Sequence, residues 1–135
     1  MTKIKIIIKF VLPLVIFFLA SCEGNTNREW RVNNESSTTI LVQARLIVGS
    51  DTLTQIIEPQ QEKIITITTE DKGNSIPQQA YDVFSYFLVT NADGETTDME
   101  YADNDSWDIY MEKSKSNPPH FEQTYTLIVT NANFK

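Results

Sequence analysis

Short segments in which apolar and polar residues alternate recur between Trp30 and Thr130, and none of these segments has helical periodicity. A repeat of two residues is typical of a β-strand that buries one face. The clearest case is Thr39 to Val48, and Lys63 to Thr69 is almost entirely β-branched, which also favours a strand. Turn sequences such as Asn91-Ala92-Asp93-Gly94 separate the segments. This pattern predicts an all-β fold.

The expected strands lie at residues 29–33, 39–48, 52–57, 63–69, 83–90, 95–101, 107–112 and 124–130. About seven or eight short strands joined by turns are typical of a single Ig-like antiparallel β-sandwich. A small lipocalin-like barrel is the alternative, because both folds use the same alternation. The segment 83–90 is apolar on both faces, which predicts a central position in its sheet.

The first twenty-two residues differ from the rest of the chain. Lys3, Lys5 and Lys9 give a basic start, an apolar run extends from Phe10 to Ala20, and the sequence Leu19-Ala20-Ser21-Cys22 follows. A basic start, an apolar run of this length and small residues after it are typical of a cleaved secretory signal. The apolar run is too short for a membrane span, which needs about 20 residues.

The sequence Leu19-Ala20-Ser21-Cys22 resembles the lipobox of bacterial lipoproteins. The resemblance implies cleavage before Cys22, acylation of its thiol, and a membrane anchor on that residue. We therefore expect a signal peptide at residues 1–21, the lipidated cysteine and a flexible polar tether at 22–28, and the β-sandwich at 29–135. The combination of this signal, the lipobox and a single all-β domain resembles small signal-peptidase-II lipoproteins of Bacteroidota.

The resemblance implies a location in the cell envelope, anchored by lipid in the outer membrane and facing either the periplasm or the cell surface. Without residues 1–21 the chain has 8 basic and 18 acidic residues, since three of the 11 Lys and Arg residues lie in the signal peptide, which gives a net charge of −10. That charge disfavours nucleic acid as a partner, because phosphate binding needs clustered basic residues. Cys22 is the only cysteine, so if it is lipidated, as the resemblance implies, no thiol remains for a disulfide, a zinc site or a nucleophile.

Eight carboxylates lie between Asp93 and Glu112, with no Lys or Arg among them. Clustered carboxylates can supply the oxygen ligands of Ca²⁺, and Asp103, Asp105 and Asp108 are the best candidates for a calcium site. The alternative is a solvated acidic edge that discourages strand pairing. Runs of like charge are usually solvated faces, so the sequence favours this second interpretation.

Three further side chains are candidates for contact with sugars or for modification. Tyr101 and Tyr110 lie beside carboxylates and are predicted to be exposed, where they could contact a glycan. Asp51-Thr52-Leu53 resembles the acceptor of the Bacteroidota O-glycosylation system, which implies a sugar on Thr52. The single histidine, His120, is predicted to be an exposed turn residue, because it has no second histidine or cysteine as a metal partner.

The sequence contains no nucleophile motif, metal-ligand set or phosphate loop that would identify an enzyme. The leading prediction is a non-enzymatic, lipid-anchored envelope protein that binds or scaffolds a glycan or another protein, without a cofactor. The alternative is a calcium-dependent adhesion or glycan-binding module. A hydrolase that uses two carboxylates is a distant third.

Overall fold

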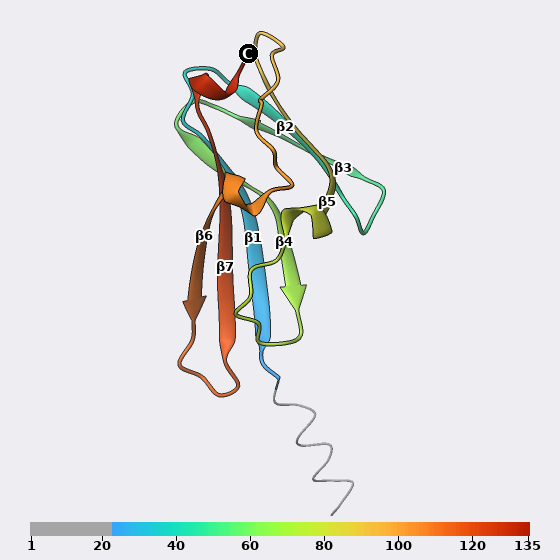
Figure 1. Ribbon diagram of the computed structural model, residues 1–135, viewed down its shortest axis with the longest axis vertical. Helices are drawn as coiled ribbons and strands as arrows, with labels where there is room; N and C mark the ends of the chain where they lie inside the picture. The colour runs from blue at the N-terminus through green and yellow to red at the C-terminus, as the bar shows by residue number, and fades with distance from the viewer. Residues whose placement is uncertain (1–22) are drawn as a thin grey trace, which may run out of the picture.

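The computed structural model describes residues 23–135, which form two β-sheets packed face to face (Figure 1). The four-stranded sheet has the order β4-β1-β7-β6 and the three-stranded sheet the order β3-β2-β5. The sheets do not close into a barrel, so the predicted β-sandwich is confirmed. The elements are β1 (Asn25–Asn34), β2 (Ile40–Leu46), β3 (Thr52–Ile57), β4 (Gln61–Glu70), η1 (Ala80–Asp82), β5 (Phe84–Asn91), η2 (Asn104–Ser106), β6 (Trp107–Lys113), β7 (His120–Val129) and η3 (Asn131–Asn133).

One strand pair differs from the antiparallel arrangement that we expected. β1 and β7 run parallel, from Asn25 opposite His120 to Asn34 opposite Val129, whereas the other neighbouring strands are antiparallel. Parallel neighbours need a long connection, which β2 to β6 supply here. The alternation of side chains is the same in both orientations, so it could not reveal the direction of pairing.

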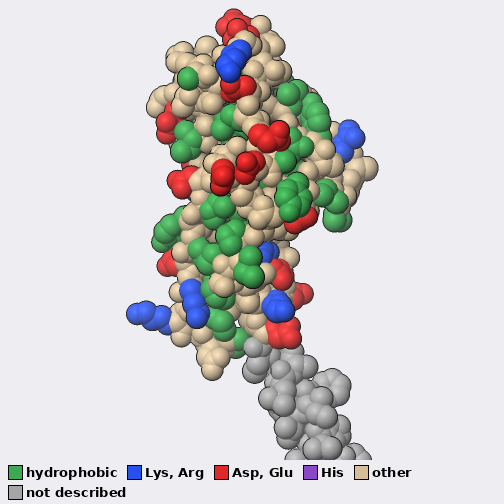
Figure 2. Space-filling view, viewed as in Figure 1, with side chains coloured by type: hydrophobic (Ala, Val, Ile, Leu, Met, Phe, Trp, Pro, Cys, Tyr) green, Lys and Arg blue, Asp and Glu red, His purple; other side chains and the backbone are tan. Residues whose placement is uncertain are grey.

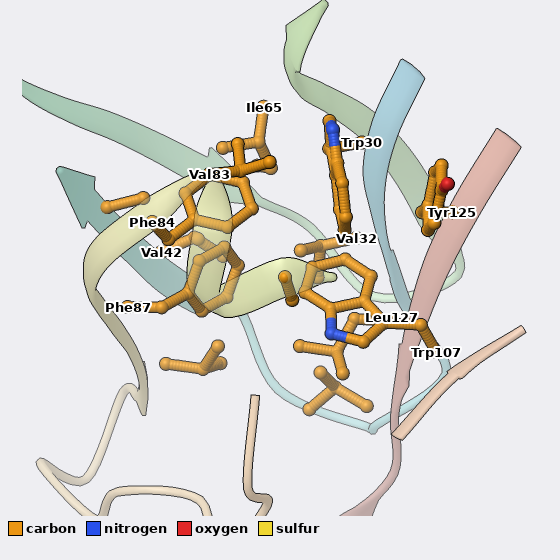
Figure 3. Close-up of a cluster of buried hydrophobic side chains, with 14 of the residues drawn as sticks. Trp30, Val32, Val42, Ile65, Val83, Phe84, Phe87, Trp107, Tyr125 and Leu127 are labelled. Carbon is orange, nitrogen blue, oxygen red and sulfur yellow. The ribbon is translucent and has the colours of Figure 1, made fainter. Parts of the chain in front are cut away.

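The core is built around the side chain of Trp30, which is fully buried between the sheets (Figure 3). Its ring stacks on Tyr125 with 3.9 Å between centroids. Trp107 and Phe84 meet it edge to face, at 5.1 and 5.4 Å. Phe84 belongs to the three-stranded sheet and the other three residues to the four-stranded sheet, so this aromatic cluster joins the two layers.

A β-bulge interrupts the pairing of β1 with β4. Trp30 lies opposite Thr66 and Arg31 lies opposite Ile64, so Ile65 is an extra residue on β4. Ile65 is buried, whereas Ile64 and Ile67 are exposed. The bulge therefore turns two consecutive residues, Ile65 and Thr66, toward the core side and leaves the isoleucines on either side of them on the outer face.

The three-stranded sheet departs from two of our predictions. β2 ends at Leu46, and Val48 is 87% exposed although alternation would place it on the buried face. β5 lies at the edge of its sheet and not at the centre. A register shift between Arg45 and Leu46 lets Phe84 and Phe87 share the core side, which explains why the sequence of β5 is apolar at both odd and even positions.

The predicted strand at 95–101 does not form. That segment makes only isolated bridges, from Thr96 to Thr90 and from Thr97 to Phe134. Its sequence is polar and provides few apolar side chains to bury against the opposite sheet. The part of the chain that the structure describes contains no helix long and apolar enough to cross a membrane.

The predicted tether is wrong for residues 25–28. β1 begins at Asn25, and Thr26 and Arg28 are both buried. Polar residues with no periodicity predict a flexible segment, but tertiary hydrogen bonds satisfy Thr26 and Arg28 inside the fold. Cys22 and the predicted signal peptide at 1–21 lie outside the described residues.

Candidate functional site

A cluster of polar side chains lies at the end of the four-stranded sheet where the described chain begins. In Figure 1 the segment between β4 and η1, residues 71–79, lies against the lower ends of β1 and β4. Long loops in compact domains often carry function. The backbone contacts of this segment therefore decide whether this end of the sandwich forms a site.

Arg28 is the centre of this cluster, and its guanidinium is almost fully buried. Its Nε donates to Oε1 of Gln123 at 3.1 Å, and its Nη2 donates to Oε2 of Glu70 at 2.7 Å. The hydroxyl of Tyr125 donates to the same Gln123 oxygen at 2.6 Å. The buried cation is thus paired with a carboxylate and hydrogen-bonded to an amide, as burial of a charge requires.

The same cluster holds the backbone of residues 71–79. Nε2 of Gln123 donates to the carbonyl of Asn74 at 2.8 Å, and the backbone N–H of Gln78 donates to the Tyr125 hydroxyl at 2.7 Å. The hydroxyl of Thr26 donates to the carbonyl of Lys72 at 2.7 Å and accepts from the backbone N–H of Asn74 at 2.8 Å. Side chains from β1 and β7 therefore provide the partners that this irregular backbone needs.

These contacts give the cluster a structural role. Burial raises the pKa of the Tyr125 hydroxyl above its ordinary value of 10, so the group is protonated at neutral pH. A protonated hydroxyl that donates to Gln123 is a poor nucleophile. The guanidinium of Arg28 is likewise held by its hydrogen bonds to Glu70 and Gln123. The cluster closes this end of the sandwich.

The Arg28–Glu70 pair predicts a modest acid sensitivity. The hydrogen bond from Arg28 holds the pKa of Glu70 below its ordinary value of 4.5. A carboxyl with a lowered folded-state pKa stabilises the fold above its unfolded pKa, and this contribution is lost as the pH falls through the folded pKa. We expect Glu70→Gln to flatten the loss of melting temperature below about pH 4.5. The effect should be small because the Glu70 side chain is 37% exposed.

Thermal melts from pH 3 to 7 would check this prediction. Glu58→Gln is the matched control, because Glu58 is exposed and its carboxylate hydrogen-bonds only a threonine hydroxyl. The prediction is contradicted if both variants keep the acid sensitivity of the parent protein.

The first described residues pack closely against the domain. Gly24 has a φ of +73°, and a Cβ at this position would lie 2.1 Å from the carbonyl oxygen of Pro119. We expect Gly24→Ala to lower the melting temperature by several degrees, because it adds a backbone clash to the strain of a positive φ. Gly94→Ala is the control, since Gly94 has a φ of +82° but open space around it. Equal losses in the two variants would show that residue 24 does not pack as described.

The three aspartates of the predicted calcium site are exposed and are not gathered into a ligand set. The side chain of Asp103 accepts from the backbone N–H of Asp105 at 3.0 Å and caps η2. Asp108 lies on β6 opposite Thr126. Residues 23–135 contain no group of three or more His, Cys, Asp or Glu side chains that could hold a metal ion. The geometry of the acidic segment therefore gives the calcium hypothesis no support.

The two tyrosines predicted to contact a glycan have different surroundings. Tyr110 is 64% exposed on β6. Tyr101 is half-buried, its ring stacks 5.6 Å from that of Phe87, and its carbonyl accepts from Nε1 of Trp107 at 2.7 Å. The prediction that both are exposed is wrong for Tyr101, which packs against the aromatic core.

Thr52 and His120 are each the first residue of a strand. Thr52 is exposed at the start of β3, where a modifying enzyme could reach it, and its O-glycosylation stays a prediction. His120 is the first residue of β7 and not a turn residue, and its ring contacts Asn25 and Glu122. The hydroxyl of Ser114 accepts from the backbone N–H of His120 at 2.9 Å, a backbone contact of the strand end.

The structure also reveals exposed apolar side chains that sequence patterns did not identify as a surface. Ile64 and Ile67 on β4 are 44% and 57% exposed, and Ile47 and Val48 in the β2–β3 hairpin are 51% and 87% exposed. Hydrophobic side chains reach the surface on the right-hand side and over the lower part of the molecule in Figure 2. A groove of about 140 Å³ lies between β4 and the end of β2, lined by Leu46, Val48, Thr68, Gln78, Asp82 and Val83.

A second, open groove of about 230 Å³ lies beside the start of β2, lined by Thr39, Ile40, Leu41, Ile56, Asn91 and Ala92. Its lining is almost entirely apolar and offers few groups that could orient a polar substrate. The described residues thus combine a structural polar cluster with grooves and faces suited to apolar contact. No protein-family model and no curated protein matches the sequence.

Proposed function

We propose that this protein is a non-enzymatic binding or scaffolding domain of the bacterial cell envelope, anchored by lipid on Cys22. The observation that carries the proposal is the position of the first strand. Only Glu23 and Gly24 separate Cys22 from β1, and Gly24 packs against Pro119. A lipid on Cys22 would hold the sandwich close to the membrane with little freedom to move away from it.

This arrangement gives the domain a near end and a far end. β1 and β7 both run away from the end where the described chain begins (Figure 1). A strand of 10 residues rises roughly 33 Å, at about 3.3 Å per residue. The turn between β1 and β2 would therefore lie well clear of the lipid headgroups. A small domain held upright in this way presents its sides and its far end to other envelope components.

The chemistry of the surface favours a protein partner. The buried polar side chains hold the fold together, whereas Ile64 and Ile67 on β4 and Ile47 and Val48 in the β2–β3 hairpin are exposed. Exposed apolar side chains in neighbouring elements are typical of surfaces that contact other proteins. Of the two tyrosines predicted to contact a glycan, only Tyr110 is exposed, because Tyr101 packs against Phe87.

Replacement of Cys22 tests the anchor. We expect the wild-type chain to sediment with membranes and Cys22→Ala to lose that association, because one acylated residue would supply the anchoring free energy. Mass spectrometry should find acyl groups on an N-terminal peptide that begins at Cys22. An unmodified Cys22 peptide from the wild type would overturn the proposal. Protease treatment of intact cells, followed through a C-terminal tag, would show which side of the membrane carries the domain.

The non-enzymatic part of the proposal has its own test. Purified protein would be assayed with glycosidic, ester and peptide substrates, beside variants of exposed carboxylates such as Asp108→Asn. We expect no turnover above background. A turnover that disappears when one carboxylate is replaced would assign a catalytic role to that residue and contradict the proposal.

A further inference from the structure

We propose that β4 is a docking edge for a second copy of this chain, so that two four-stranded sheets join into one eight-stranded sheet across a twofold axis. The proposal deepens the scaffolding function by naming the partner, but it does not depend on the lipid at Cys22. It rests on three properties of β4: its free edge, the faces set by its bulge, and the apolar hairpin beside it.

β4 is the longest of the four edge strands. It has 10 residues and pairs with β1 alone among the described strands. Natural edge strands are usually short, charged or interrupted by proline. β6, the opposite edge, carries Asp108 and Glu112, and β3 has only 6 residues. The edge of β5 is partly covered by residues 96 and 97, through the Thr90–Thr96 bridge and the backbone N–H of Thr97, which donates to the carbonyl of Val89 at 3.0 Å. The stretch of β4 from Ile64 to Thr69 contains no charge and no proline, so its free backbone groups can accept another strand.

The bulge at Ile65 determines which residues of β4 face outward. On a regular strand Ile64 and Ile67 would lie on opposite faces, because they are an odd number of positions apart. The extra residue places both on the outer face, where they are 44% and 57% exposed. Glu62 and Thr69 extend the same exposed face, while Ile65 and Thr66 point to the core side.

This distribution of faces fits a twofold axis between Ile65 and Thr66. Antiparallel pairing of two copies about that axis places Ile64 opposite the partner's Ile67, and the reverse, so that four isoleucines gather at the centre. Residues directly opposite each other share a face and lie about 5 Å apart at their Cβ atoms. A shift by one residue would place Ile64 opposite the partner's Thr66 or Thr68, which face the other side.

The charges on β4 agree with the same register. Glu62 lies opposite the partner's Thr69, Lys63 opposite the partner's Thr68, and Gln61 opposite the partner's Glu70. Like charges directly opposite each other would destabilise a strand pair, and this register contains none. The sequence of β4 is therefore complementary to itself in the one register that its bulge allows.

The β2–β3 hairpin lies on the same side of the molecule. It projects to the right beyond β4 in Figure 1, and its residues Ile47 and Val48 are among the exposed apolar residues. The groove between this hairpin and Thr68 has a largely apolar lining. One strand pair alone buries less than a stable dimer needs, about 1,200–2,000 Å². Contacts of the hairpins with the partner would add apolar area to that of the paired strands.

Engineered cysteines can test the register directly in the full chain. In the double variant Glu62→Cys with Thr69→Cys, each cysteine lies opposite the other cysteine of the partner. We expect mild oxidation of membranes or of purified protein to produce a disulfide-linked dimer, which a reductant converts back to monomer. Within one chain these positions are roughly 20 Å apart along β4, at about 3.3 Å per residue, so they cannot form an internal disulfide.

The single variants are matched controls. Two copies of residue 62, or two copies of residue 69, lie roughly 20 Å apart in the proposed register. Neither single variant nor the parent chain, which reports any reaction of Cys22, should form the covalent dimer. No cross-linking of the double variant, or equal cross-linking of the single variants, would overturn the proposal. A disulfide adduct with a protein of another mass would also overturn it, because the partner would not be a second copy.

A surface substitution separates association from folding. Adding Ile67→Lys to the double-cysteine variant should lower the yield of dimer at least tenfold, because it places a charge at the centre of the strand pair. Its melting temperature as a monomer should stay close to that of the parent, since Ile67 is exposed. The same dimer is expected in a Cys22→Ala background. If the chain with an intact Cys22 proves to be unacylated but still dimerises, only the lipid anchor is rejected. If that chain is acylated but monomeric, only the β4 interface is rejected.

Discussion

Replacing Asn34 with aspartate is expected to destabilise the sandwich by about 3–5 kcal/mol, although the two side chains have nearly the same shape. Asn34 is fully buried at the end of β1. Its Nδ2 donates to the carbonyls of Thr38 and Ile57, at 2.8 and 2.9 Å. Its Oδ1 accepts from the backbone N–H and the hydroxyl of Ser36, at 3.0 and 2.6 Å. A carboxylate would keep the contacts with Ser36 but would turn an oxygen toward the two carbonyls.

The pH dependence of Asn34→Asp distinguishes the effect of charge from an effect of shape. Burial and the facing carbonyls of Thr38 and Ile57 disfavour the charged form, so the pKa of an aspartate here would be raised in the folded state. The penalty should therefore be largest at neutral pH and should shrink as the pH falls toward the unfolded value of about 4. Chemical denaturation at several pH values measures it directly.

Asn33→Asp provides the matched control for the change at position 34. Asn33 is half-buried on the outer face of β1, and its amide contacts the exposed carboxylate of Glu35. The same added charge should cost at most about 1 kcal/mol at position 33, because solvent screens it. If the two variants lose the same stability at neutral pH, the buried carbonyls do not govern the effect at position 34.

Replacing Trp30 with alanine is expected to cost about 3–5 kcal/mol, the range seen when a large aromatic is removed from a core. The ring of Trp30 is fully buried and contacts aromatic rings from both sheets (Figure 3). Its loss would leave a cavity at the point where the layers meet. Urea denaturation of the wild type and the variant gives the change in the free energy of unfolding.

Two further variants calibrate the effect of Trp30→Ala. Trp30→Phe should cost much less, because it keeps a ring and removes a buried Nε1 that has no hydrogen-bond partner within residues 23–135. Tyr110→Ala removes an aromatic ring that is 64% exposed and should change stability by less than about 1 kcal/mol. A similar loss from Trp30→Ala and Tyr110→Ala would contradict a core centred on Trp30.

The sequence predicted those strands whose ends are marked by local chemistry. β3 has the predicted bounds, Thr52–Ile57, because Gly49-Ser50-Asp51 precedes it and Pro59 follows it closely. The start of β1 was not predictable in the same way. Thr26 is polar, and its place inside a strand depends on hydrogen bonds to residues 72 and 74, which local patterns do not contain.

Which isoleucines of β4 are exposed could not be predicted from the sequence, for a related reason. Ile64, Ile65 and Ile67 form an apolar run that fits a buried strand equally well, and only the register with β1 shows that Ile65 is the buried one. The calcium prediction failed to gain support because composition brings carboxylates together along the chain. Asp103 caps η2 and Asp108 lies on β6, so their positions in space depend on the fold.

The parallel pairing of β1 with β7 also determines how the domain would respond to tension. A pull between Cys22 and a partner held at the far end would act along the axis of β1. Ten residue pairs join β1 to β7, from Asn25 opposite His120 to Asn34 opposite Val129. A force in that direction loads these hydrogen bonds together in shear, whereas a force across the strands would open them one after another. The sandwich should therefore resist extension from its anchored end more strongly than extension from the β2–β3 hairpin.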